Sequence, residues 1–131
     1  MENAVELDSH SQIIVGVFKQ MRDVFEMSGQ GIYIYLDDQN KVCNSKFAAM
    51  LGYASPEEWA SVKQNFPTAF VAEKSQRALV ETYQRAVERG TGSSINIVWK
   101  RKTGGTVKTQ VILVPLSFED HRMALHFVTE S

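Results

Sequence analysis

Apolar residues near the start of the chain recur with the period of a helix. Between residues 13 and 25 they are spaced three or four positions apart, and charged or amide side chains fill the opposite side. We expect an amphipathic helix over residues 11–28, preceded by a flexible polar segment over residues 1–10. Four of its apolar residues have the spacing of a two-heptad seam that is too short for a coiled coil: Ile14, Phe18, Met21 and Phe25. They can cover an open sheet face of a second copy, which makes them the predicted dimer interface; the alternative is that the helix packs on its own domain.

The apolar period changes after residue 30 and predicts a β-hairpin. Ile32, Ile34 and Leu36 alternate with two tyrosines, which is the period of a strand whose faces meet different surroundings. Residues 38–40 supply a turn, with Asn40 expected at positive φ, and residues 41–43 return as a paired strand.

Two short capped helices are predicted next. Asn44 can cap a helix over residues 45–51, which Gly52 can end in the left-handed conformation. Ser55 to Glu58 forms a capping box with proline at the first helical position, so a second helix begins there and carries Trp59. Apolar side chains form the inner sides of both helices, which indicates a wall over a sheet.

The remaining pattern predicts one long helix and three strands. After a loop around residues 65–67, residues 73–89 are helical and end at Gly90. Strands over residues 94–102 and 106–116 are joined by a glycine-containing hairpin, and residues 122–129 form the last strand. Strands at both ends with helices grouped between them predict an α+β domain, with an antiparallel sheet of five strands and short helices over one face.

Composition agrees with one globular domain and limits the classes of partner. The chain has 131 residues, 44% hydrophobic and 22% charged, with a formal charge of −1, so no general attraction to nucleic acid or to a membrane surface is expected. The basic run at residues 100–102 fits a solvated hairpin tip. A single cysteine, Cys43, and the lack of an apolar run of about 20 residues favour a cytoplasmic domain.

Several turn and cap positions together resemble a PAS domain. The similarity runs from about residue 25 to residue 131 and rests on Asn44, on Leu-Gly-Tyr at residues 51–53 and on Ser-Pro-Glu-Glu at residues 55–58. Asn40 stands where the family usually has glycine. The segment FPTAFVAEKSQ lacks the His-Pro-Glu-Asp-like start that is common before the long helix. We therefore take residues 29–131 as the PAS-like domain.

The resemblance implies a sensory or interaction module rather than an enzyme. PAS domains commonly belong to larger signalling proteins whose effector is a histidine kinase, a cyclic-dinucleotide enzyme or a DNA-binding domain, here expected outside this chain. They often dimerise through a helix before the first strand. They also often hold a small molecule between the sheet and the central helices.

The resemblance and the apolar pattern together give a candidate ligand site of few polar groups. Its predicted residues are Ile34, Leu51, Phe70, Leu79, Tyr83, Trp99, Val111, Leu113 and His126. A filled core made by the same residues is the alternative, and the strand face on which Trp99 lies is left open. A domain with such a filled core would be a ligand-free interaction adaptor.

The sequence leaves the identity of a ligand unknown and argues against two cofactors. Cys43 does not lie in the Asn-Cys-Arg-Phe-like motif of the family's flavin-binding light sensors, so we expect a buried structural cysteine rather than cysteinyl-flavin photochemistry. The long helix has no histidine to ligate haem. A small α+β enzyme acting on a hydrophobic molecule is the alternative function, with His126 and Tyr83 as the candidate acid or base.

Overall fold

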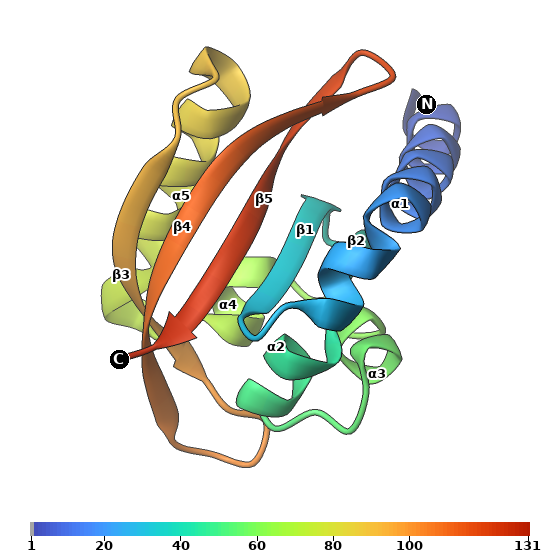
Figure 1. The fold of residues 1–131 in the computed structure, drawn as a ribbon. Helices are drawn as coiled ribbons and strands as arrows, with labels where there is room; N and C mark the ends of the chain where they lie inside the picture. The colour runs from blue at the N-terminus through green and yellow to red at the C-terminus, as the bar shows by residue number, and fades with distance from the viewer. Residues whose placement is uncertain (1) are drawn as a thin grey trace.

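The computed structural model describes residues 2–131, with side chains from residue 9 onward. Helix α1 precedes a hairpin, four helices follow, and three strands complete the chain (Figure 1). The elements are α1 (Glu2–Met27), β1 (Gly31–Asp37), β2 (Asn40–Cys43), α2 (Ser45–Met50), α3 (Pro56–Ala60), α4 (Phe66–Phe70), α5 (Glu73–Arg89), β3 (Ser93–Lys100), β4 (Thr106–Phe118) and β5 (His121–Glu130).

One antiparallel sheet with the strand order β2-β1-β5-β4-β3 organises the fold. Helix α5 lies along β3 and β4, whereas α1 lies beside β1 and β2 (Figure 1). Two separate apolar clusters result, one between the sheet and α2 to α5 and one between the sheet and α1. The predicted α+β architecture is confirmed.

The N-terminal helix is longer than predicted and packs on its own sheet. It begins at Glu2, so the flexible segment expected over residues 1–10 is helical from residue 2; Glu2 to Leu7 contain no glycine or proline that would end a helix. Its apolar side chains cover the outer face of the central strands. The cluster contains Ile13, Ile14, Val17, Phe25, Ile32, Ile34, Met123 and Leu125.

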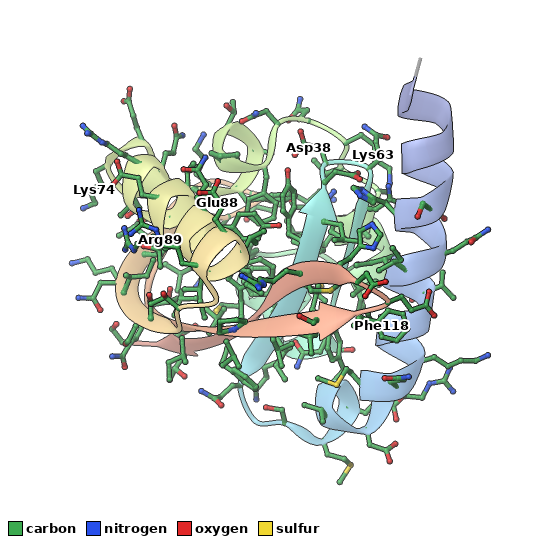
Figure 2. The ribbon with its side chains drawn as sticks, turned by 90° about the horizontal axis from the view of Figure 1, so that it is seen from above. Asp38, Lys63, Lys74, Glu88, Arg89 and Phe118 are labelled. Carbon is green, nitrogen blue, oxygen red and sulfur yellow. The ribbon has the colours of Figure 1, made fainter. Side chains whose placement is uncertain are left out.

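Two contacts fix the position of α1 against the strand ends. The ring of Phe118 lies beside α1 (Figure 2), and a Cβ at Gly16 would come within 2.9 Å of its Cζ, so glycine permits the close approach. Nearer the start of α1, Nδ1 of His10 lies 2.5 Å from Oδ2 of Asp37 at the end of β1. These contacts place His10 and Gly16 of α1 against the ends of β1 and β4.

The predicted caps are present, and one helix was missed. Asn44 and Ser55 accept backbone N–H groups at the starts of α2 and α3. The segment expected as a loop contains α4, because Asn65 caps it and Pro67 occupies its first turn. Gly52 and Gly90 end α2 and α5 with φ of 86° and 65°, the predicted left-handed conformation.

The expected positive φ at Asn40 is wrong. Asn40 is the first residue of β2, and its amide donates to both carboxylate oxygens of Asp37 across the turn. The two-residue turn that requires positive φ joins β4 to β5 instead, at Glu119 and Asp120, with φ of 48° and 66°. None of the described helices has the length and apolar character that a bilayer crossing requires.

Candidate functional site

A cleft of about 280 Å³ opens between helix α5 and the inner face of strands β1 and β5. The segment that leads into α4 forms its third side. The lining residues are Tyr33, Tyr35, Asn65, Phe66, Pro67, Leu79, Val80, Tyr83, Gln84 and His126. None of these residues carries a formal charge with histidine neutral, and most of them are aromatic or aliphatic.

The period of the strands brings aromatic rings together at the base of the cleft. Tyr33 and Tyr35 point to one face of β1, and Tyr33 pairs directly with His126 of β5. The rings of Tyr33 and His126 stack with centroids 3.9 Å apart and planes 11° apart. Tyr83 of α5 lies nearly parallel to the His126 ring at 6.1 Å. The base and one wall of the cleft are therefore flat aromatic surfaces.

His126 is a neutral, buried side chain. Only 1% of the residue is exposed, and burial lowers the pKa of its imidazole to about 3, with backbone carbonyls of Tyr33 and Ala124 opposing the shift. Nδ1 lies 3.3 Å from the Tyr33 carbonyl oxygen. Because a carbonyl can only accept, this contact is a hydrogen bond when Nδ1 carries the proton, and in that tautomer Nε2 is an acceptor.

Hydrogen bonds tie the other cleft tyrosines to the end of β1. The Tyr83 hydroxyl donates to the Tyr35 carbonyl oxygen at 3.0 Å, and burial raises the pKa of Tyr83 to about 12. The Tyr35 hydroxyl donates to Oδ1 of Asp38, and burial together with this carboxylate raises the pKa of Tyr35. These tyrosines remain protonated at neutral pH and act as neutral groups.

The pKa values of His126 and Tyr83, the two candidates for an acid or base, both lie far from neutral pH. An efficient general base has a pKa near the working pH, and the pKa of His126, about 3, is far below neutral pH. The Tyr83 hydroxyl donates within the fold, so the two residues proposed for an enzyme do not form an acid–base pair. An uncharged molecule suits such a lining, since a charged ligand would lose its hydration without a counter-ion.

The structure divides the nine predicted ligand residues into three groups. Leu79, Tyr83 and His126 line the cleft. Five others belong to the filled inner core and do not line it: Leu51, Phe70, Trp99, Val111 and Leu113. Trp99 faces this core, where its indole N–H donates to Thr109.

The prediction for Ile34 is wrong. Ile34 lies on the outer face of β1, under α1. Side chains alternate along the strand, and the tyrosines, not the isoleucines, face the central helices α2 to α5. Seven of the ten residues that line the cleft were not predicted from the sequence, and two of them, Tyr33 and Tyr35, lie on the alternating strand β1. The signal was the alternation itself, which separates isoleucines from tyrosines but does not say which set faces inward.

The predicted dimer residues lie partly inside the single chain. Ile14 and Phe25 are buried between α1 and its own sheet, which is the alternative weighed for this helix. Phe18 and Met21 pack at the edge of the same cluster and are half-buried. Only these two of the four have surface left for a second copy.

Cys43 and the histidines do not form a second chemical centre. Cys43 is buried at the end of β2, and burial raises the pKa of its thiol, so the reactive thiolate is disfavoured. Within the described residues, no three histidine, cysteine or acidic side chains are grouped so that they could hold a metal ion.

Comparisons with known proteins identify the fold. No family model matches the sequence, and no curated protein matches it either. A PAS domain from a two-component sensor histidine kinase is similar at a TM-score of 0.66 and 16% identity, covering 87% of this chain and 96% of that one. The PAS domain of a Colwellia psychrerythraea protein is similar at a TM-score of 0.68 and 18% identity, covering 88% of this chain and 97% of that one. A Rhodobacter sphaeroides LOV protein is similar at a TM-score of 0.67 and 19% identity, covering 86% of this chain and 66% of that one. The strand order, the helices on both sides of the sheet and these likenesses show that the chain has the fold of a PAS domain.

Proposed function

We propose that this chain is a sensory module that binds a small molecule in the cleft and passes the change to α1. The observation that carries the proposal is the double use of β1 and β5. Tyr33, Tyr35 and His126 line the cleft on one face of these strands, and Ile32 and Leu125 contact α1 on the other. A shift of either strand on ligand binding therefore acts on both surfaces.

Polar contacts provide a second link between the cleft and α1. The Tyr83 hydroxyl of α5 donates to the Tyr35 carbonyl oxygen, and the Tyr35 hydroxyl donates to Asp38. The adjacent Asp37 is hydrogen-bonded to His10 of α1. Hydrogen bonds from His10, Asn40 and the Gln39 backbone lower the pKa of Asp37 against the opposing effect of burial. A ligand that displaces Tyr83 would disturb this chain of contacts.

Similar structures give the biological setting that we propose. One of them is a PAS domain of a two-component sensor histidine kinase, and another is the Vibrio cholerae VqmA dimer, whose structure bears on the DNA-binding mechanisms of LuxR-type receptors. We propose that this domain likewise works within a regulatory protein whose effector, a kinase, a cyclic-dinucleotide enzyme or a DNA-binding domain, lies outside this chain.

We further propose that α1 and the open part of the outer sheet face form a homodimer. Five large apolar side chains are exposed there: Val15, Val24 and Met27 on α1, and Ile112 and Val114 on β4. Val24 and Met27 lie on one side of α1, and Ile112 and Val114 lie on one face of β4; exposed apolar groups that gather in this way indicate an interaction surface. Together with half-buried Phe18 and Met21, they would bury more apolar area against a second copy.

Native mass spectrometry of freshly purified protein tests the ligand. We expect extra mass on the folded protein that is lost on denaturation. The variant Val80→Trp places a large ring at the mouth of the cleft and should lose this mass. Ala78→Trp is the matched control, since Ala78 is also exposed on α5 but does not line the cleft. Equal extra mass on both variants would contradict binding in the cleft.

Light scattering tests the homodimer. We expect Phe18→Glu with Met21→Lys to give monomers, and Val24→Glu with Ile112→Lys to do the same without touching the intrachain cluster. Dimers that persist in both double variants would show that another surface associates, and a monomeric parent protein would contradict the dimer outright.

A further inference from the structure

The chemistry of the cleft specifies the class of molecule that it can take, and His126 provides the first constraint. Its Nδ1–H is directed at the Tyr33 carbonyl oxygen, 3.3 Å away, so the neutral ring presents Nε2 as a hydrogen-bond acceptor. The ring is 1% exposed and lines the cleft. No described residue donates to Nε2, and an acceptor with little access to water is more stable with a donor, so the site favours a molecule that supplies an N–H or O–H group.

The hydroxyl of Tyr33 is the second constraint. Tyr33 is 1% exposed and lines the cleft beside His126. The hydroxyls of Tyr35 and Tyr83 both donate within the fold, but that of Tyr33 has no hydrogen-bond partner in the part of the chain described. Burial and the neighbouring Tyr83 raise its pKa, so it remains a neutral O–H group. Nε2 of His126 and the Tyr33 hydroxyl therefore have no hydrogen-bond partner among the described residues, and neither is sealed off from the cleft that both residues line.

Size, shape and charge complete the description. At about 280 Å³ the cleft lies just below the range of roughly 300 to 1,000 Å³ that holds drug-sized ligands. Stacked rings form its base, which suits a flat molecule. No formally charged side chain lines it, so a carboxylate or an ammonium group would be buried without a partner.

We propose that the cleft takes a small, neutral, planar aromatic molecule that donates one hydrogen bond to Nε2 of His126. The proposal rests on the proposed function, because it names the ligand class of the same cleft. The Tyr33 hydroxyl holds the same polar edge of the ligand, and the aromatic walls hold its faces. The acceptor distinguishes this ligand from an apolar molecule of equal size, and the uncharged lining distinguishes it from an acid.

Three probe molecules separate these features: phenol, toluene and benzoate. Phenol and toluene have nearly the same shape but only phenol donates a hydrogen bond, and benzoate carries a charge. Binding is followed by NMR titration of the full chain and of two variants. His126→Leu removes the acceptor. His121→Leu is the matched control, because His121 starts β5, does not line the cleft and has its Nδ1 beside the Glu119 carbonyl oxygen.

The expected result is a change in selectivity. The wild-type chain and His121→Leu bind phenol, benzoate binds at least tenfold more weakly, and His126→Leu weakens phenol about tenfold while leaving toluene within about twofold. Nitrogen chemical shifts of His126 in the free protein should show a protonated Nδ1 and a bare Nε2, and phenol should shift Nε2. This last measurement needs no variant, so it holds even if His126→Leu folds poorly.

Different results contradict the ligand class and the proposed function. Toluene or benzoate binding as well as phenol, or a protonated Nε2 in the free protein, overturns the ligand class but leaves a cleft that binds small molecules. No binding of any probe, with no extra mass on freshly purified protein, overturns the ligand class together with the proposed function.

Discussion

Lowering the pH from 7.5 to 5 should destabilise the fold through His126. In the folded chain burial lowers the pKa of His126 to about 3, whereas the side chain has its ordinary value of 6.5 when the chain unfolds. Between these values the unfolded chain binds a proton that the folded chain does not. Stability is therefore fully present above pH 6.5 and falls as the pH drops toward 3.

The two pKa values give the size of the effect. Each pH unit inside this window costs about 1.4 kcal/mol, and allowing for partial protonation near pH 6.5, His126 contributes a loss of about 2 kcal/mol between pH 7.5 and pH 5. The loss is a large fraction of the stability of a domain of this size, which is typically about 5 to 15 kcal/mol.

Urea denaturation of the wild-type chain and of His126→Phe at both pH values measures this contribution. His10 and His121 are present in both proteins, so the difference between the two pH dependences isolates His126. The variant should lose about 2 kcal/mol less than the wild type over this interval. Equal losses in the two proteins would show that His126 is not buried in its neutral form, and would refute the description of the cleft base.

Four further variants test the contacts that stabilise the fold. Asn44→Ala should cost about 2 to 4 kcal/mol in urea denaturation, because the Asn44 side chain bonds the backbone at four positions that join α1, β1 and α2; Ser55→Ala, which removes one cap, should cost about 1 kcal/mol. Replacing Glu119 and Asp120 by Asn-Gly should raise stability by about 1 kcal/mol, since both have positive φ, and an unchanged melting temperature would contradict the turn assignment. Lys41→Met should cost about 1 to 3 kcal/mol, because this buried ammonium donates to three backbone carbonyls, and a neutral result would show that they are hydrated without it.

Local signals in the sequence were sufficient for most of the fold. The Asn44 and Ser55 caps, the glycines after α2 and α5 and the alternation of the strands each act within a few residues, so they could be identified without knowing what packs against them. Helix α4 was missed because its Asn-Phe-Pro start was interpreted as a turn. Its cap and its proline were the available signal.

The cleft depended on information that the sequence does not carry locally. Both faces of β1 are buried, one under α1 and one under the central helices, so hydrophobicity could not decide whether Ile34 or Tyr35 faces inward. Val111 and Leu113 of β4 lie on the inner face of the sheet, but the sequence could not show whether a cavity or other side chains lie next to them. The position of a cavity depends on how side chains from distant elements fill the core.

Hydrogen exchange of α1 amides tests most directly the claim that the cleft and α1 are coupled. The wild-type chain is compared with and without saturating phenol, and Val80→Trp serves as the variant with an obstructed cleft. The account predicts that phenol changes the protection of amides in α1 around His10 and Phe25, and that it does not do so in Val80→Trp. Phenol that binds the cleft and leaves α1 exchange unchanged would contradict it.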